Sequence, residues 1–424
     1  MIRIYKYGEQ NKEEIFARGN AVKDVSAAVS EIIACVKKNG DKAVKEYCEK
    51  FDGAKLGDLA VSEEELTEGL KAVEPEFLRI LKQAAKNIER FHKKQIRKGF
   101  ALRKKDGTVV GQKITPIEKV GLYVPGGTAA YPSTVLMNAI PARIAGSELI
   151  VITTPPDKNG RINPAILAAA LVAGVDRIYK VGGAQAIAAL AYGTESIPKV
   201  DKIVGPGNAY VAEAKKQVFG AVNIDMIAGP SEILIIADGK SEPSYIAADL
   251  LSQAEHDKMA SAILITDSYE LAVKVRDAVE KQLADLPRSA IARASVDDNG
   301  KIIIAESIAQ AIEIANGIAP EHLELCVDQP FEYLCDVKNA GSVFLGRFSP
   351  EALGDYFAGP NHTLPTVGTA RFSSPLSVDD FIKKTQFIYY TESALDKVAD
   401  KIAYFAETEG LTAHAKSAKI RSKK

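Results

Sequence analysis

Hydrophobic residues recur at three- and four-residue intervals through much of the first hundred positions, which is the spacing of one face of a helix. Asp24 can cap a first helix, and Asn39-Gly40 interrupts its apolar pattern. Ser62 and Glu65 then form a capping-box pattern ahead of a second amphipathic stretch. The segment from about 24 to 97 is therefore predicted to be helical scaffold.

The pattern changes from about Gly111, where short runs rich in β-branched residues alternate with glycine turns and alanine-rich helical segments. The predicted strands lie near residues 120–124, 149–153, 178–181, 202–204, 224–227, 232–237, 262–266 and 301–305. Strand, turn and helix in repetition are typical of parallel sheets with helices on both faces. The sequence thus predicts two α/β domains of related topology, with a seam near Gly229-Pro230-Ser231 and a helical tail after about Pro375.

Length and charge limit the class of protein. The chain has 424 residues, 54 Lys and Arg against 55 Asp and Glu, and an ordinary globular composition. The near-zero net charge gives no electrostatic reason to expect a nucleic acid or a membrane as partner. The start has no apolar signal region, and the longest apolar run, 165–175, is shorter than the roughly 20 residues that span a bilayer. We expect a cytoplasmic protein.

The four cysteines, Cys35, Cys48, Cys326 and Cys335, form no C-x-x-C pair and lie among apolar or helical neighbours. We expect buried, reduced thiols. The alternative is a catalytic thiol, for which Cys326, four residues after His322, is the candidate.

Only five histidines occur, so the context of each is informative. His92 lies in a charged run and is predicted to be a surface residue. The other four stand beside carboxylates, Pro or Gly: Gln253-Ala254-Glu255-His256, Pro320-Glu321-His322, Gly359-Pro360-Asn361-His362 and Glu409 to His414.

A polar stripe marks one predicted helix. Asp249, Gln253 and His256 fall at i, i+4 and i+7, on a face that would ordinarily be apolar. An imidazole beside oxygen donors at this spacing is half of a metal site. The alternative is a solvated helix end.

The pair Glu321-His322 follows a helix-breaking Pro and enters a predicted strand. A carboxylate that activates water and an imidazole that accepts a proton are suited to acid–base chemistry near neutral pH. The alternative is a surface pair before a strand.

A long loop is predicted over 354–368, where glycine and proline are frequent. Such loops are usually functional, and Asp355 could supply the anionic ligand that Gln253 and His256 lack. His414 and Glu409 lie on the tail, where a histidine usually has no role unless the tail docks somewhere.

Four glycine turns follow predicted strands, at Gly126-Gly127, Gly182-Gly183, Gly205-Pro206-Gly207 and Gly229. At the carboxyl edge of a parallel sheet such turns let backbone amides approach a dinucleotide. No G-x-G-x-x-G is present, however, and Asp201, the acidic residue nearest the expected distance from Gly182, opens the next strand. A standard Rossmann site is not expected, and the glycines could serve only to make tight turns.

Taken in order, the distinctive strings of the chain resemble those of the histidinol dehydrogenase family. They are 121–127, 132–136, 181–186, 205–208, 228–232, 251–256, 319–322 and 359–362. The resemblance implies oxidation of L-histidinol to L-histidine in two NAD-dependent steps through the aldehyde, with one bound zinc ion per subunit. It also implies a homodimer whose C-terminal segment reaches the partner's active site.

The resemblance further implies a role for particular residues. Glu321 and His322 would be the acid–base residues, and the zinc ligands would be Gln253, His256, Asp355 and His414. The NAD contacts would be Tyr123, Gln185 and Asn208. The substrate would contact Ser231, His322, His362 and Glu409 together with the four zinc ligands. No cysteine falls in the shared strings, which disfavours a covalent thiol route.

The domains implied are two incomplete Rossmann-like folds. An N-terminal extension would cover 1–22, the first domain 23–122 plus 232–375, the second domain 123–231, and a dimer-contacting helical tail 376–424.

Two other classes stay open from the residues alone. A metal-dependent hydrolase would use the same His and carboxylate set without a nucleotide edge. A small-ligand binding protein would need neither Glu321 nor His322.

Overall fold

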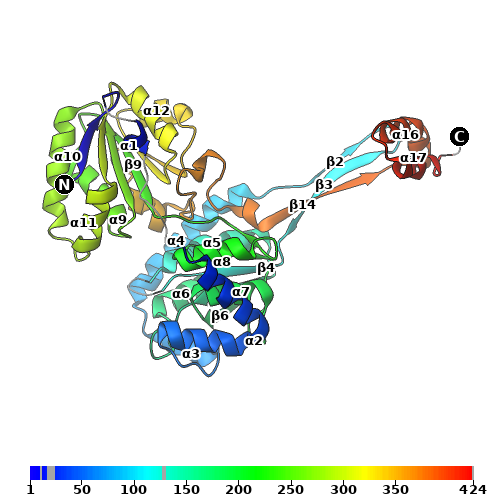
Figure 1. Cartoon of the computed structure of the whole chain (residues 1–424), viewed down its shortest axis with the longest axis horizontal. Coiled ribbons are helices and arrows are strands. Elements are labelled where there is room, and N and C mark those ends of the chain that lie inside the picture. Colours follow the sequence, from blue (N-terminus) through cyan, green and yellow to red (C-terminus); the bar gives the residue numbers. More distant parts are fainter. Residues whose placement is uncertain (10–11, 17–23, 127–129, 423–424) are drawn as a thin grey trace.

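The computed structural model describes residues 1–9, 12–16, 24–126 and 130–422. It has two lobes, each built on a parallel sheet, and a long antiparallel ribbon that carries a pair of helices away from both lobes (Figure 1). The α/β class and the two parallel sheets predicted from the sequence are confirmed.

One lobe contains a six-stranded parallel sheet in the order β1-β11-β10-β9-β12-β13. Its strands are β1 (Arg3–Lys6), β9 (Glu232–Ala237), β10 (Ser261–Thr266), β11 (Lys301–Ile304), β12 (His322–Cys326) and β13 (Ser342–Leu345). Every residue of the central strands β9 and β12 is buried, as expected for a sheet covered on both faces. The covering helices are α9 (Pro243–Ala254), α10 (Tyr269–Leu283) and α11 (Ser289–Asn299) on one face, and α12 (Ile308–Ile318) with α1 (Lys12–Phe16) on the other.

The other lobe contains a five-stranded parallel sheet in the order β6-β5-β4-β7-β8. Its strands are β4 (Lys119–Tyr123), β5 (Leu149–Thr154), β6 (Arg177–Lys180), β7 (Lys202–Val204) and β8 (Asn223–Ile224). One face is covered by α2 (Ser26–Asp52), α7 (Gly183–Tyr192) and α8 (Ala209–Val218). The other is covered by α3 (Glu63–Lys71), α4 (Pro75–His92), α5 (Pro132–Ala145) and α6 (Pro164–Ala173).

The predicted division of the chain needs correction at its N-terminal part. The helices between 26 and 92 pack on the five-stranded sheet, because the apolar faces of α2 and α4 meet α7 and α5. The sequence-based division assigns them instead to the domain that contains 232–375. Residues 3–6, predicted as part of an N-terminal extension, form β1, which pairs with β11 at the edge of the six-stranded sheet.

Local predictions hold in the helical part. Ser62 and Glu65 form the reciprocal capping box. Gly40 interrupts α2 with φ 54° and ψ −136°, a conformation that glycine adopts without a Cβ clash.

Two predictions about single residues were wrong. His92 is fully buried, with Nδ1–H donating to the carbonyl of Ile88 (2.8 Å) and the Asn361 amide 3.4 Å from Nε2. Cys335 is exposed, whereas the other three cysteines are buried or half-buried.

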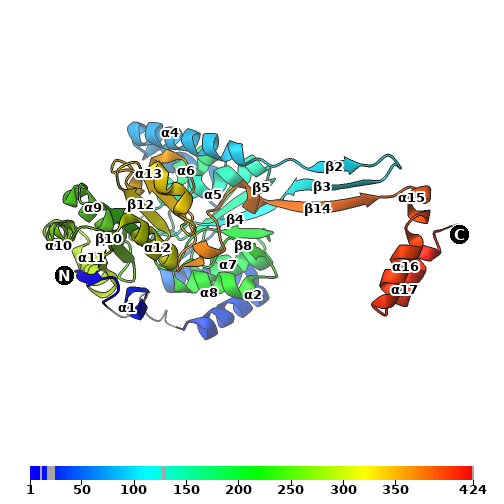
Figure 2. The same ribbon diagram turned by 90° about the horizontal axis from the view of Figure 1, so that it is seen from above.

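The ribbon was not predicted. It pairs β14 (Ile382–Tyr389) with β3 (Val109–Pro116), which also pairs with β2 (Phe100–Arg103), all antiparallel. Seven of the eight residues of β14 are exposed, so no alternation of buried and polar positions marks the strand. Beyond it lie α15 (Glu392–Asp396), α16 (Ala399–Thr408) and α17 (Thr412–Lys419), at the far end of the ribbon in both views (Figures 1 and 2). The described part of the chain contains no helix that is both long and apolar enough to cross a bilayer.

Candidate active site

The first element of the site is the end of α9. This helix runs from the carboxyl edge of the six-stranded sheet back to its amino edge, where Gln253 is buried and His256 is half-buried. Asp249, one turn earlier, contacts Glu324 of β12 instead.

The second element is the start of β12, which lies beside the start of β9. The Glu321 carboxylate accepts a hydrogen bond from the backbone N–H of Glu232 (2.9 Å). His322 donates from Nδ1 to the carbonyl of the same residue (2.9 Å). This bond fixes the tautomer of the neutral ring, so that Nε2 carries the free lone pair.

The third element follows β13. A turn of helix, α14 (Glu351–Leu353), continues into a π-helical turn over Gly354–Ala358, where the sequence predicted a loop. It brings Glu351 Oε1 to 3.8 Å and Asp355 Oδ1 to 3.7 Å from Nε2 of His322. Glu351 was missed from the sequence, although its spacing of four from Asp355 on one helical face is a usable signal.

Burial and mutual charge shift the pKa values of these groups. Burial raises the pKa of Glu321 to about 7, and burial together with Asp355 raises that of Glu351 to about 8. Burial alone would lower the pKa of His322, but the carboxylates of Glu321, Asp355 and Glu351 outweigh it and raise the value to about 10. Burial opposes ionisation of Asp355, yet its contact with His322 and the nearby His362 lower its pKa far below the usual range.

Three buried polar atoms in this cluster have no hydrogen-bond partner within the described structure: Nε2 of Gln253, Nε2 of His322 and Oε1 of Glu351. Buried polar groups are normally paired, so orphaned atoms at one place indicate a ligand. The donor atoms of His322, Glu351 and Asp355 lie within 4.8 Å of one another and could hold a metal ion. Imidazole, carboxylate and amide donors suit zinc and similar divalent metals.

His362 connects this cluster to the other lobe. Its Nδ1 donates to the carbonyl of Asp355 (3.1 Å), and its Nε2 lies 3.5 Å from the hydroxyl of Thr134 at the start of α5. Burial lowers the pKa of His256, and the negative charge of Asp355 opposes this shift. His256 therefore lies near Asp355. Ser231 immediately precedes β9, beside Glu232.

Two predicted residues do not reach the cluster within one chain. Glu409 follows the last residue of α16 and His414 lies on α17, and both are exposed; the two helices lie at the far end of the ribbon (Figure 2). The single chain therefore unites Gln253, His256 and Asp355, but not the fourth predicted zinc ligand.

The predicted NAD contacts lie at the carboxyl edge of the five-stranded sheet. The Tyr123 hydroxyl, at the end of β4, accepts from the backbone N–H of Gly183 (3.1 Å). Gln185 in α7 is buried with its Oε1 unpaired, and the exposed Asn208 caps α8. Of the predicted glycine turns, Gly127 lies outside the described residues.

Comparison with known proteins agrees with this arrangement. The family model described as histidinol dehydrogenase matches residues 17–422. The chain belongs to the histidinol dehydrogenase family. It is 56% identical over 428 residues to the histidinol dehydrogenase of Clostridium acetobutylicum, covering 100% of this chain and 99% of that protein. It is 57% identical to that of Geobacillus kaustophilus, covering 94% of each.

Among solved structures, the chain is similar to the crystal structure of histidinol dehydrogenase from Elizabethkingia anophelis. The TM-score is 0.94 and the identity 42%, over 99% of this chain and 98% of that one. The described fold, including the ribbon and the helical pair, therefore has a counterpart of the same architecture within the family.

Proposed function

We propose that this protein oxidises L-histidinol to L-histidine through the aldehyde, with two NAD+ as hydride acceptors. The observation that carries the proposal is the buried Glu321-His322 pair beside orphaned metal-binding donors, in a chain of the histidinol dehydrogenase family. The carboxyl edge with Tyr123 and Gln185 would bind NAD. A cytoplasmic location stays a prediction.

Gln253, His256 and Asp355 would hold a zinc ion together with His414 of a second subunit. Bound there, the ion would act as a Lewis acid that orients the amine and imidazole nitrogens of the substrate. His322 and Glu351 lie in contact with Asp355 and offer the nearest alternative donors. Ser231, His362 and Glu409 would contact the substrate.

In the first oxidation, Nε2 of His322 would accept the hydroxyl proton while the adjacent carbon loses hydride to NAD+ and becomes the aldehyde. The ring must be neutral for this step, and a divalent cation held by Asp355 would offset the carboxylate charge that raises the pKa of His322. The Nδ1–H bond to the Glu232 carbonyl holds the ring in the required orientation. The same bond stabilises the protonated ring that results.

In the second oxidation, Glu321 would remove a proton from water as the water oxygen attacks the aldehyde carbon. The aldehyde oxygen would take up the proton that His322 gained in the first oxidation, which completes the hydrate and returns His322 to its neutral form. The hydrate would then lose hydride from carbon to the second NAD+ and a hydroxyl proton to His322, which yields the carboxylic acid. The pKa of Glu321, raised to about 7 by burial, suits a general base near neutral pH.

A homodimer would bring Glu409 and His414 to the partner's cluster. Tyr404 and Phe405 on α16 are 76% and 68% exposed, and Ile388 on the ribbon is 74% exposed. Apolar surface of this kind is typical of a protein interface. Mixing subunits tests the arrangement: His322→Asn and His414→Asn homodimers should each be inactive, whereas a mixed dimer has one intact site, so a random 1:1 mixture should recover about a quarter of wild-type activity. No recovery would contradict a shared site.

The direct test of function is the NADH yield per L-histidinol together with the metal content of the purified protein. Two NADH per substrate and one zinc per subunit are expected. No NADH with L-histidinol and NAD would favour a metal-dependent hydrolase, and binding without turnover would favour a ligand-binding protein.

A further inference from the structure

The acidic residue that follows the second strand of the five-stranded sheet, β5, is Asp157, and its Oδ1 is engaged within its own turn by the backbone N–H groups of Asn159 and Arg161 (2.8 Å each). In a Rossmann fold an Asp or Glu at the carboxyl edge accepts hydrogen bonds from the adenosine ribose. Asp201 cannot serve, because its carboxylate accepts from the backbone N–H of Lys119 (3.2 Å), at the amino edge where β4 begins.

The end of α2 supplies a carboxylate to the opposite edge. Cys48, in the last turns of α2, donates from its thiol to the carbonyl of Lys180 (3.7 Å), where β6 ends. The chain then leaves α2 at Gly53, in the left-handed conformation, and runs along β6, with the Lys180 N–H donating to the Leu59 carbonyl (2.7 Å). Asp52 is thereby fixed at the carboxyl end of β6.

Asp52 has an unexplained buried oxygen. Its Oδ2 is inaccessible to solvent and has no hydrogen-bond partner within the described structure. Burial raises the pKa of Asp52 to about 6, and its charge contributes to the raised pKa values of Cys48 and Tyr123. Asp52 therefore lies near the predicted NAD contact Tyr123.

A second orphaned acceptor lies at the same edge. Oε1 of Gln185 is also buried and unpaired. It lies so close to the backbone of Gly183 that a Cβ added at this glycine would be 2.7 Å away. Two unpaired acceptors call for a ligand that donates hydrogen bonds. Ribose hydroxyls donate, whereas the ionised phosphates of a dinucleotide only accept.

We propose that Asp52, a residue from outside the sheet, binds the 2′- and 3′-hydroxyls of the adenosine ribose of NAD, a role that an acid after the second strand has in a Rossmann fold. This inference rests on the proposed use of NAD. A carboxylate at the 2′-hydroxyl also repels a 2′-phosphate, so Asp52 would select NAD over NADP.

The test compares Asp52→Asn with Glu49→Gln, which removes an exposed charge from the same helix. The probe is ADP-ribose, titrated calorimetrically into the full-length protein. Asp52→Asn should weaken binding about 10- to 100-fold, the range for loss of a charged hydrogen bond. The KM for NAD should rise in parallel, while kcat and the KM for L-histidinol stay within about twofold. Glu49→Gln should change none of these.

Two further measurements separate binding from folding. Wild type should bind ADP-ribose 2′-phosphate more weakly than it binds ADP-ribose. In Asp52→Asn the difference between these two affinities should be smaller. The thermal midpoint of Asp52→Asn should equal or exceed that of wild type, because an orphaned buried charge is removed. If the asparagine side chain of Asp52→Asn perturbs folding, the Asp52→Ala variant allows the same comparison without a polar side chain at this position.

Equal ADP-ribose affinities for wild type and both Asp52 variants would overturn the inference, even if stability changed. That result is distinct from failure of the proposed function, in which wild type itself would form no NADH from L-histidinol and NAD.

Discussion

The two parallel sheets are built alike, yet opposite edges are proposed to carry the chemistry. In the six-stranded sheet Glu321 and His322 lie at the amino edge, where β12 begins. In the five-stranded sheet Tyr123 and the glycine turns lie at the carboxyl edge. The similarity of fold therefore does not decide where a ligand binds.

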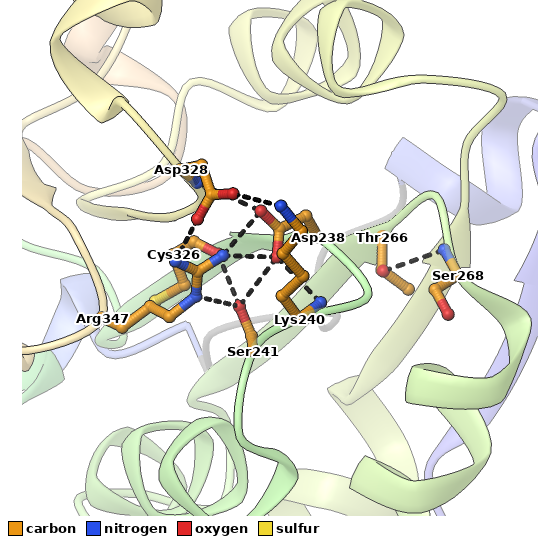
Figure 3. Close-up of polar contacts among 8 residues, drawn as sticks. All are labelled: Asp238, Lys240, Ser241, Thr266, Ser268, Cys326, Asp328 and Arg347. Atoms are coloured by element: carbon orange, nitrogen blue, oxygen red, sulfur yellow. Dashed lines mark hydrogen bonds and ion pairs between the residues drawn. The ribbon is translucent and has the colours of Figure 1, made fainter.

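The carboxyl edge of the six-stranded sheet shows why. Strand order reverses between β9 and β12, which is where open α/β sheets usually bind ligands. Arg347 occupies this crevice, bonded to both carboxylate oxygens of Asp238 (2.6 and 2.7 Å) and to Asp328 (2.7 Å) (Figure 3). It also reaches Ser241, whose hydroxyl donates to the Cys326 carbonyl.

At the matching point of the five-stranded sheet, between β4 and β7, stands Gly205. A Cβ at Gly205 would lie 2.1 Å from the carbonyl oxygen of Tyr123, so only glycine allows the end of β7 to approach the end of β4 this closely. Both crevices therefore hold an ion pair, because the Gly205 N–H donates to Asp225 (2.8 Å) and Lys215 pairs with that carboxylate and donates to the Gly205 carbonyl (3.0 Å). They differ in that only the Gly205 crevice depends on a close approach of backbone to backbone.

The largest expected effect is at the amino edge. His322→Asn should lower kcat for both oxidations by about 10²- to 10⁴-fold, because the proton acceptor is lost. Stopped-flow NADH formation from L-histidinol and from the aldehyde measures both steps, and ADP-ribose affinity serves as the control. A kcat within tenfold of wild type would exclude His322 as the base.

Glu321→Gln should separate the two oxidations. Without the carboxylate that activates water, oxidation of supplied aldehyde should fall by about 10²-fold or more, and the first oxidation should fall less. The two half-reactions can be assayed separately with substoichiometric NAD. Equal losses in both would contradict this division of roles.

Arg347→Met should affect stability rather than binding. Loss of its charged hydrogen bonds should lower the free energy of unfolding by about 1–3 kcal/mol, measured by urea denaturation. The KM for NAD should not change. A raised KM for NAD would show that the two carboxyl edges do not differ in the way described.

The pH dependence of stability should sharpen the comparison at Asp52. Its pKa is raised in the folded protein, so it stabilises the fold when protonated, and this contribution is lost as pH rises through about 6. The thermal midpoint of Asp52→Asn should therefore be higher than that of wild type at pH 8. The difference between the two midpoints should become smaller toward pH 4. A difference that widens at low pH would contradict the raised pKa.

Cys326→Ala should have the smallest effect. The thiol is buried, and burial with Glu324 raises its pKa well above the usual range, so it does not form a nucleophilic thiolate. We expect kcat within about twofold of wild type and a loss of stability near 1 kcal/mol. Loss of the aldehyde step alone would revive a covalent thiol route.

Sequence patterns predicted the parts of the fold that are buried on both sides. β9 and β12 are continuous apolar or strand-forming runs between turn signals, so they were found. β14 is exposed along nearly its whole length and carries no such signal. His92 stands in a charged run, and its burial depends on Asn361, a residue 269 positions away.

The candidate site divides in the same way. Local strings and the family resemblance indicated Gln253, His256, His322 and Asp355, and the chain brings these four into one region. Asp52 could not be found, because its significance comes from β6 and Tyr123, which only the folded chain places beside α2. The catalytic and ligand-binding roles of all these residues stay predictions until they are measured.

The most direct measurement is a crystal structure of the His322→Asn dimer with L-histidinol and NAD, since slow turnover should preserve both ligands. We expect the substrate hydroxyl beside residue 322, the adenosine ribose beside Asp52, and the nicotinamide between the two lobes. NAD bound instead at the Arg347 edge, or a substrate hydroxyl remote from residue 322, would contradict the assignment of proton chemistry and nucleotide binding to opposite edges.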